Sequence, residues 1–293
     1  MQFFIFDLMK DFASLNDLSK WIKNELSALY PEREIDSLIQ IIYEYTINLE
    51  KTKILLKENL NPAPEKLKKI KEIVSRLKKA EPVQYITGET YFRDCRLKVD
   101  KNVLIPRQET EELVEWVISD NKLTNPKILD IGTGSGCIAI SLARIIPHSQ
   151  VWATDINKSI LNLARENASV NNVKVHFLEH DIAVDQEFGF ESFDIIVSNP
   201  PYILNKEMPL IPDNVKYFEP PEALFVDDSD SLFFYDKISE FALVHLKKNG
   251  SLFFEINEKK GNEVAALLSK KGFRKIVLHK DINGKDRFIK SSL

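Results

Sequence analysis

The chain has 293 residues, of which 44% are hydrophobic and 29% are charged, and its formal net charge is -4. These values are typical of a folded globular protein, and they exclude an intrinsically disordered chain and a polycation that coats nucleic acid. Only two cysteines occur, Cys95 and Cys137, so a disulfide framework is also excluded and a reducing compartment is expected.

Residues 1–81 are predicted to form a small helical bundle. Hydrophobic residues recur at steps of three and four in the segments 15–29, 35–43 and 67–77, so each set lies on one face of a helix. Pro31 and Pro64 stand where a helix can begin, because the first turn of a helix does not need the N–H group that proline lacks. A shorter helix is expected at about 52–60.

Residues 82–105 are predicted to be an extended, hairpin-like connector, since they contain Gly88, several β-forming residues and a strand-like alternation at 96–100. Strand and helix patterns then alternate through residues 106–293, which predicts a doubly wound, Rossmann-like α/β domain. A closing antiparallel hairpin is expected around Asn283-Gly284. The predicted strands are 127–131, 150–154, 173–178, 193–198 and 251–256, and the predicted helices are 136–146, 157–170, 231–248 and 258–271.

A glycine-rich loop, Gly132-Thr133-Gly134-Ser135-Gly136, directly follows the predicted strand 127–131. Glycine lets the backbone approach a ligand without a side-chain clash, and the first N–H groups of the next helix then face that ligand. Asp155 ends the next strand, where its carboxylate can bind both ribose hydroxyls of an adenosine group. Asp181 follows the third strand and is expected near the adenine amino group. A turn without a ligand would explain the glycines but not these spaced acids.

Two kinds of cofactor suit this loop, a dinucleotide and S-adenosylmethionine. Dinucleotide-binding folds favour the spacing G-x-G-x-x-G, but here the third glycine comes one position early and Cys137 occupies its usual place. Asp130 precedes the turn, and an acidic group there suits a cationic ligand better than a pyrophosphate. The ammonium and sulfonium groups of S-adenosylmethionine therefore favour it, although the loop by itself leaves a nicotinamide cofactor open.

The tetrapeptide Asn199-Pro200-Pro201-Tyr202 directly follows the predicted strand 193–198. Ligands in open α/β sheets bind outside the carboxyl ends of the strands, so these residues, Asn199 included, are expected beside the cofactor. The prolines make the backbone rigid and leave the Asn199 side chain and the Pro200 carbonyl free as acceptors. Tyr202 offers a flat face to a planar group. A purely structural proline turn is the alternative.

These groups match the chemistry of amide methylation. An amide nitrogen is a poor nucleophile because its lone pair is delocalised into the carbonyl group. Two acceptors on its two N–H bonds would hold the nitrogen in line with a sulfonium methyl group and favour the charge that develops during attack. No general base is required, because a methylated, protonated amide loses its proton readily.

At these residues the chain resembles the PrmC (HemK) family, the release factor glutamine methyltransferases. The N-P-P-Y element alone is shared with adenine-N6 methyltransferases of DNA, whereas the complete set in this order is specific to the family. The resemblance extends from Pro82 to Lys290. Its segments are 84–88 (QYITG), 104–111 (LIPRQETE), 130–136 (DIGTGSG), Asp155, 198–202 (SNPPY), 218–220 (FEP), 223–224 (AL) and 281–287 (DINGKDR).

The resemblance implies methyl transfer from S-adenosyl-L-methionine, with S-adenosyl-L-homocysteine as product, to N5 of the glutamine in the Gly-Gly-Gln motif of peptide chain release factors. It assigns the cofactor to residues 132–136 and Asp155, and the substrate amide to residues 199–202. In related enzymes a large side chain that covers the adenine can follow the acid after the third strand. Here that residue is Ile182, so we expect an apolar contact without stacking. The N-terminal bundle is expected, by analogy, to recognise the release factor.

Several alternatives remain open from the sequence. Arg107, Glu109, Thr110 and Glu111 are expected to line the site, or Thr110 to start the helix that follows. No metal is expected, because the five histidines lack metal-ligand spacing. Adenine-N6 methylation of nucleic acid is the main alternative function; a cofactor-sensing module and a nicotinamide dehydrogenase are more distant ones.

The expected surroundings of the protein follow from what the sequence lacks. No secretory signal and no apolar run of the roughly 20 residues needed for a membrane helix is present, so we expect a cytoplasmic protein that does not enter a membrane. We expect a monomer whose partners are release factors and which binds no nucleic acid stably.

Overall fold

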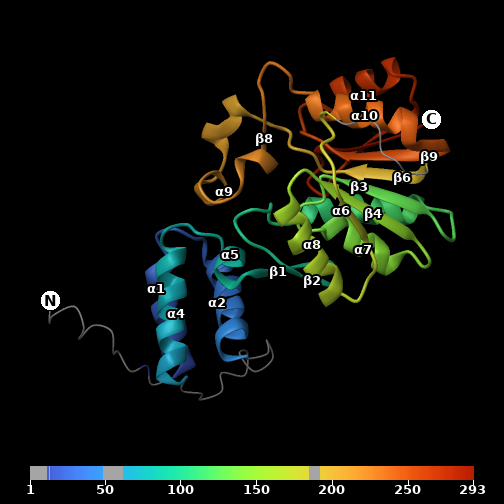
Figure 1. Ribbon diagram of the computed structural model, residues 1–293. Coiled ribbons are helices and arrows are strands. Elements are labelled where there is room, and N and C mark those ends of the chain that lie inside the picture. The colour runs from blue at the N-terminus through green and yellow to red at the C-terminus, as the bar shows by residue number, and fades with distance from the viewer. Residues whose placement is uncertain (1–11, 13, 49–61, 185–191) are drawn as a thin grey trace. The chain divides into compact units, whose positions relative to one another are not determined.

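The computed structural model describes residues 12, 14–48, 62–184 and 192–293, and the helix expected at 52–60 lies outside them. The chain divides into two compact units, Met1–Thr87 and Gly88–Leu293 (Figure 1). No helix among the described residues combines the length and the apolar character that a membrane crossing requires.

The N-terminal unit is a helical bundle, as the hydrophobic pattern predicts. Helices α1 (Leu15–Leu26), α2 (Glu32–Ile47) and α4 (Pro64–Leu77) each bury one face in a common core. Pro64 occupies the first turn of α4, where its missing N–H group costs nothing. The core includes Leu18, Ile22, Leu26, Ile39, Ile42, Tyr43, Ile70, Val74 and Leu77.

One short segment corrects the prediction of an extended connector. Residues 83–87 form helix α5 (Val83–Thr87) instead of extended chain. The Pro82 carbonyl accepts the first helical hydrogen bonds, and Val83 and Ile86, three positions apart, both bury in the bundle core. Gly88 then takes a φ of +77°, which ends the helix. Local β-propensity was therefore overridden by burial of one apolar helical face.

The hairpin part of the connector forms as predicted, and it is the first element of the C-terminal unit. Strands β1 (Glu89–Phe92) and β2 (Cys95–Lys98) pair antiparallel. Phe92 and Leu97 are buried in the same core as helices α6 (Gln108–Asp120) and α7 (Cys137–Ile145).

A seven-stranded sheet forms the centre of the C-terminal unit, with the order β10-β11-β9-β6-β3-β4-β5. Five strands run parallel, and β10 with β11 forms an antiparallel hairpin at one edge, so the predicted doubly wound α/β sheet with a closing hairpin is confirmed. The strands are β3 (Lys127–Ile131), β4 (Gln150–Asp155), β5 (His176–Glu179), β6 (Phe193–Ser198), β9 (Leu246–Glu255), β10 (Arg274–Lys280) and β11 (Asp286–Ser292).

Helices cover both faces of this sheet (Figure 1). Helices α6, α7 and α8 (Lys158–Val170) pack on one face, and α10 (Phe233–His245) and α11 (Gly261–Lys270) pack on the other. Successive residues of a strand point to opposite faces, so Ile128 belongs to the first core and Leu129 to the second. Both faces of the central strands are therefore covered by helices, which explains why most of their residues are hydrophobic.

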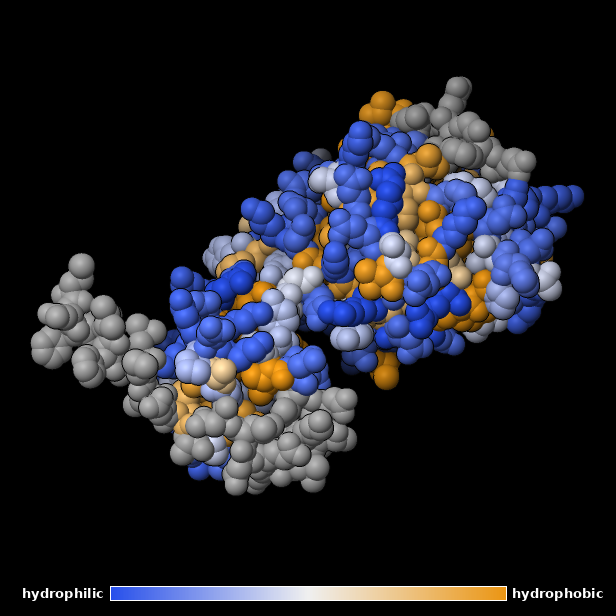
Figure 2. Space-filling model, turned by 60° about the horizontal axis from the view of Figure 1, so that its bottom comes forward, coloured by the Kyte–Doolittle hydropathy of each residue, from blue (hydrophilic) through white to orange (hydrophobic). Residues whose placement is uncertain are grey.

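Short elements connect β6 to α10 above the carboxyl ends of the strands. They are β7 (Ile203–Leu204), η2 (Asn205–Leu210), α9 (Asp213–Lys216), η3 (Pro221–Ala223) and β8 (Phe225–Val226), and β7 pairs with β8. Hydrophilic side chains cover most of the described surface on the face that Figure 2 shows, with hydrophobic groups scattered among them. The large apolar side chains are otherwise concentrated in the three cores.

Candidate active site

The candidate site lies where the direction of strand addition reverses in the sheet. Strand β3 has β4 on one side and β6 on the other, so the loops after β3 and β6 diverge from neighbouring positions. Ile131 pairs with Thr154 and with Ser198, which puts Gly132 and Asn199 at the same level of adjacent strands. Such a point is the usual ligand site of an open α/β sheet, and the motif spacing alone predicts this meeting.

All three glycines of the loop adopt positive φ angles, but they serve two different purposes. A Cβ atom on Gly132 (φ +72°) or Gly134 (φ +54°) would meet no atom of the described residues within 4 Å, so these glycines leave open space above the loop. A Cβ atom on Gly136 (φ +85°) would lie 2.9 Å from Cδ1 of Ile140 and 3.3 Å from Cβ of Ala164. Gly132 and Gly134 therefore form a cradle, whereas Gly136 lets helices α7 and α8 approach each other.

The loop is anchored to the strand beside it. The N–H groups of Gly132 and Thr133 both donate to the Thr154 carbonyl, at 2.9 and 2.8 Å. Ser135 is buried, and its carbonyl accepts a hydrogen bond from the Asn167 amide at 2.9 Å. These bonds hold the cradle rigid before any ligand binds.

Asp130 lies beneath the loop and is fully buried. Its Oδ2 atom accepts from the Thr133 hydroxyl at 2.6 Å and from the Ala139 N–H at 3.2 Å, while Oδ1 is buried without a hydrogen-bond partner among the described residues. Burial raises the pKa of Asp130 to about 7. The sequence suggested a charge that faces a cationic ligand, whereas the structure adds a second task, which is to hold the loop and the start of α7 together.

Asp155 ends β4 beside the cradle. Its Oδ2 atom accepts from the Gly134 N–H at 3.0 Å, and Oδ1 accepts from the Asn157 N–H at 3.1 Å. These bonds fix the carboxylate, although burial raises its pKa. Ile156, the next residue, is 63% exposed, and an apolar side chain so exposed beside this acid is a candidate to cover a planar ring. Sequence reasoning missed it, because a single isoleucine after a strand carries no motif.

Asp181 and Ile182 follow β5 near the same edge. Glu179 pairs with Asp155 in the sheet, and the next residue, His180, donates its N–H to the Asp155 carbonyl at 3.1 Å. The Oδ1 atom of Asp181 accepts from the Ala183 N–H at 2.9 Å. Ile182 is partly buried against the core on the α10 face of the sheet.

These residues fit S-adenosylmethionine. The open space over Gly132 and Gly134 admits a ligand next to the backbone, and the carboxylate of Asp155 can still accept from ribose hydroxyls. The Asp130 carboxyl ionises near pH 7, and its ionised form adds negative potential under the loop, which suits a cation. A dinucleotide would need room for a pyrophosphate where these acids concentrate negative charge.

The tetrapeptide after β6 borders a cavity of about 90 Å³. Asn199, Pro200 and Tyr202 contribute to its wall, and the remaining wall is mostly apolar. Such a volume is far below that of a site for a drug-sized ligand and suits one inserted side chain. The Asn257 amide donates to the Tyr202 carbonyl at 3.2 Å, which fixes the end of the tetrapeptide. The apolar wall consists of Leu104, Ile203, Val215, Ala223 and Leu224.

An ion pair closes one side of the cavity. Arg107 lines it, and its guanidinium donates to Oε1 of Glu219 at 2.5 Å. Glu219 is almost fully buried and also accepts from the Ile105 N–H at 3.4 Å. Burial raises the pKa of the Glu219 carboxyl, and the neighbouring Arg107 opposes that shift. The sequence segments Phe218-Glu219-Pro220 and Ile105-Pro106-Arg107 therefore contact each other through this ion pair.

Thr110 belongs to the site and does not start the helix. It lies inside α6 and is buried, and its hydroxyl donates to Oε2 of Glu255 at 2.7 Å. The Asn199 amide nitrogen donates to the Thr110 hydroxyl at 3.1 Å, and the Tyr202 hydroxyl donates to Oε1 of Glu255 at 3.1 Å. Glu255 was missed in the sequence, where the signal was an acidic residue directly after the apolar run Leu252-Phe253-Phe254.

Glu109 and Glu111 do not line the cavity. Glu111 accepts from the Arg93 N–H at 2.7 Å, on a groove along the outer side of α6. Glu109 lies at the start of α6 and adds negative charge near Glu255. Of the four residues considered in this segment, Arg107 and Thr110 reach the site.

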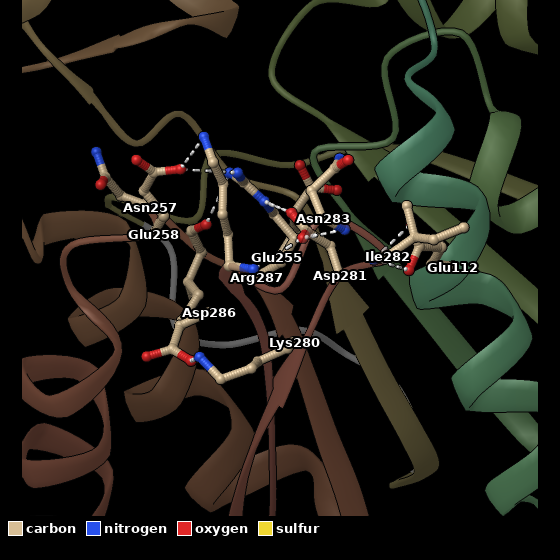
Figure 3. A network of polar contacts seen from close by, with 12 residues as sticks. Glu112, Glu255, Asn257, Glu258, Lys280, Asp281, Ile282, Asn283, Asp286 and Arg287 are labelled. Carbon is tan, nitrogen blue, oxygen red and sulfur yellow. Dashed lines mark hydrogen bonds and ion pairs between the residues drawn. The ribbon is translucent and has the colours of Figure 1, made fainter.

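The closing hairpin explains the DINGKDR segment (Figure 3). The Oδ1 atom of Asp281 accepts from the N–H groups of Asn283 and Lys285, at 2.9 and 3.0 Å, which shapes the turn. Arg287 then makes ion pairs with Asp281 at 3.2 Å and with Glu258 at 3.4 Å. The segment is thus a structural turn that places a guanidinium beside the end of β9.

Comparison with known proteins agrees with this geometry. The family model described as the PrmC N-terminal domain matches residues 17–88, and the Methyltransferase small domain matches residues 109–211. The release factor glutamine methyltransferase of Flavobacterium psychrophilum is 46% identical over 90% of this chain and 94% of its own length. That of Bacteroides thetaiotaomicron is 37% identical over 94% of this chain and 99% of its own length.

Solved structures show the same fold at low identity. A methyltransferase from Pyrococcus furiosus aligns with a TM-score of 0.51 at 18% identity, over 68% of this chain and 89% of that one. The hMettl16 catalytic domain, in complex with an RNA hairpin, aligns with a TM-score of 0.55 at 15% identity, over 78% and 81% of the two chains. The chain therefore belongs to the release factor glutamine methyltransferase family and is an S-adenosyl-L-methionine-dependent methyltransferase.

Proposed function

We propose that the protein methylates N5 of the glutamine in the Gly-Gly-Gln motif of peptide chain release factors. The observation that carries this proposal is a side-chain-sized cavity whose wall holds the Asn199 carboxamide, one strand away from the glycine cradle. The relatives that match most of the chain are release factor glutamine methyltransferases, which agrees with this substrate. S-Adenosyl-L-methionine supplies an electrophilic methyl carbon on a sulfonium and its own leaving group, S-adenosyl-L-homocysteine.

We assign the cofactor to the cradle and the acids beside it. The backbone of Gly132, Thr133, Gly134, Ser135 and Gly136 faces the ligand, and Asp155 accepts from the ribose hydroxyls. We assign Asp181 to the adenine amino group. Ile182 and the exposed Ile156 provide apolar contacts to the ring. Asn199, at the same level of the neighbouring strand, faces the methyl-bearing end of the cofactor.

We assign the glutamine amide to the tetrapeptide. The Oδ1 atom of Asn199 and the Pro200 carbonyl accept the two N–H groups of the amide, and Tyr202 packs against its plane. Pro200 and Pro201 fix the backbone, so that both acceptors are in place before the substrate arrives. The cavity holds the nitrogen in line for attack. The protonated product amide is a strong acid and releases its proton without a dedicated base.

Labelled cofactor tests the proposed function directly. We expect the protein to transfer a tritiated methyl group to a purified release factor, and peptide mass spectrometry to locate it on the glutamine of Gly-Gly-Gln. A release factor with that glutamine replaced by alanine is the matched substrate control. Label on another residue, or none at all, would refute the assignment.

The variant Asn199→Ala tests the proposed site. We expect the Kd of the cofactor to stay within about twofold while kcat falls by roughly 10²–10³-fold, as for removal of one group that stabilises developing charge. Calorimetric titration gives the Kd, and the labelled methyl assay gives kcat. Unchanged kcat would mean that Asn199 does not bind the reacting amide.

The shared N-P-P-Y element made adenine methylation the main alternative in the sequence. The relatives named above support the release factor instead, and DNA offered in the same labelled assay separates the two. We further propose that the enzyme acts as a monomer in the cytoplasm, where its proposed substrate functions in translation, and that it binds no nucleic acid stably.

A further inference from the structure

A chain of hydrogen bonds links a buried carboxylate to the side chain of Asn199. Glu255 is 1% exposed at the end of β9, and its Oε2 atom lies 2.7 Å from the Thr110 hydroxyl. The same hydroxyl lies 3.1 Å from Nδ2 of Asn199. The register of the sheet brings Asn199 and Glu255 close together. Ser198 in β6 pairs with Phe254 in β9, and Asn199 and Glu255 are the next residues along these two strands.

The chemistry of these groups gives the chain one direction. An ionised carboxylate only accepts hydrogen bonds, so the single hydroxyl proton of Thr110 is committed to Glu255. The Thr110 oxygen is then left with acceptor capacity only towards Asn199. It must receive an N–H of the amide, and the Oδ1 atom of Asn199 is therefore turned away from Thr110. No described residue donates to that Oδ1 atom.

One further hydrogen bond and one nearby positive charge act on the Glu255 carboxylate. The Tyr202 hydroxyl donates to its second oxygen at 3.1 Å, so both carboxylate oxygens act as acceptors. Arg287 lies on β11, the antiparallel neighbour of β9, and bonds to Ile256, the residue after Glu255. The Arg287 carbonyl accepts from the Ile256 N–H at 2.8 Å, and the Arg287 guanidinium donates to the Ile256 carbonyl at 3.5 Å. Burial raises the pKa of Glu255, and the hydrogen bonds from Thr110 and Tyr202 and the positive charge of Arg287 act against this rise and favour the ionised form. The hairpin turn in Figure 3 anchors Arg287 through Asp281.

We propose that Glu255 and Thr110 are positioning residues that set which way round the Asn199 carboxamide is presented to the substrate. This inference rests on the proposed function, in which Asn199 accepts an N–H of the substrate amide. With the amide reversed, Asn199 would offer its NH₂ group to the NH₂ group of the glutamine, donor against donor. Packing alone cannot prevent this reversal, because the two ends of a carboxamide have nearly the same shape. The direction of the hydrogen bond between Thr110 and Asn199 can prevent it.

Removal of the Thr110 hydroxyl tests the inference. Thr110→Val keeps the shape but frees the Asn199 amide to rotate, so we expect kcat to fall at least about tenfold while the Kd of S-adenosylmethionine is unchanged. Thr110→Ser restores the hydroxyl, and we expect its kcat to return to within about threefold of the wild type. Thr46→Val is the matched control, because Thr46 is also buried in a helix but its hydroxyl bonds, among the described residues, only to the Ile42 carbonyl.

A spectroscopic readout makes the inference testable without turnover. In protein labelled with ¹⁵N-asparagine, the side-chain NH₂ signal of Asn199 is identified by its loss in Asn199→Ala. We expect this signal to shift and its protons to exchange faster in Thr110→Val, and to be restored in Thr110→Ser. If Thr110→Val does not fold, Thr110→Ala takes its place, since it also lacks the hydroxyl.

The outcomes separate this inference from the proposed function. Wild-type kcat in Thr110→Val, an equal loss in Thr110→Val and Thr110→Ser, or an unmoved Asn199 signal would each overturn the positioning role. Failure of the wild-type enzyme to methylate a release factor would overturn the proposed function instead. The amide signal reports the orientation of Asn199 in either case.

Discussion

Replacing Gly134 by alanine separates the cost to the fold from the cost to cofactor binding. The Gly134 backbone has a φ of +54°, and the added Cβ atom would meet no protein atom within 4 Å. Alanine in the left-handed region costs about 1–2 kcal/mol. Since a unit of this size loses about 2–4 °C in Tm per kcal/mol, we expect a drop of roughly 2–8 °C.

The added methyl group also occupies the cradle. If the cofactor lies against this backbone, the methyl group forces it outward, and we expect the Kd to rise at least about tenfold, or about 1.4 kcal/mol. Gly136→Ala has the same backbone strain but drives a Cβ atom into Ile140 and Ala164, which adds about 1–3 kcal/mol of overpacking. We therefore expect Gly136→Ala to be the less stable variant, by roughly 2–5 kcal/mol in total relative to the wild type.

Scanning calorimetry gives the stability, because the transition that S-adenosylmethionine shifts belongs to the unit that binds it. Titration calorimetry gives the Kd. Gly272→Ala is the matched control, since its φ is +97° and its Cβ atom would also meet nothing within 4 Å, but it lies between α11 and β10. We expect Gly272→Ala to lose Tm without losing affinity. Equal affinity in Gly134→Ala and the wild type would refute the assignment of the open space to the cofactor.

Two further predictions concern the buried carboxyl groups. Glu219→Gln removes the charge that pairs with Arg107. We expect this variant to lower the free energy of unfolding by about 1–3 kcal/mol and to raise the KM for the release factor. Calorimetry and steady-state kinetics measure these two changes, and an unchanged Tm would contradict the prediction. Burial raises the pKa of Asp130 from 3.8 to about 7, so the folded state binds more protons than the unfolded state between about pH 4 and pH 7 and loses stability as the pH rises through that window. We expect Asp130→Asn to lose less stability than the wild type between pH 5 and pH 7 in urea titrations, and equal losses would show that Asp130 ionises normally.

Local patterns were sufficient to predict the architecture and the two motif loops. Hydrophobic patterning placed β3 and β6 at their observed residues, because both are buried on two faces and are therefore mostly apolar. The pattern failed at residues 83–87, where β-forming side chains adopt a helix that buries Val83 and Ile86 in the bundle core. It also placed the start of β9 at residue 251 instead of Leu246, since strand ends depend on the neighbouring strand.

The glycine loop, Asp155 and the residues 199–202 could be recognised in the sequence because each follows a strand that can be recognised, and parallel strands bring their carboxyl ends to one edge. The partners of these residues could not be recognised in that way. Thr110 and Glu255 are 145 positions apart, and Arg107 and Glu219 are 112 positions apart. Whether such side chains meet depends on the order and register of the strands and on which way each side chain points, and no local periodicity carries that information.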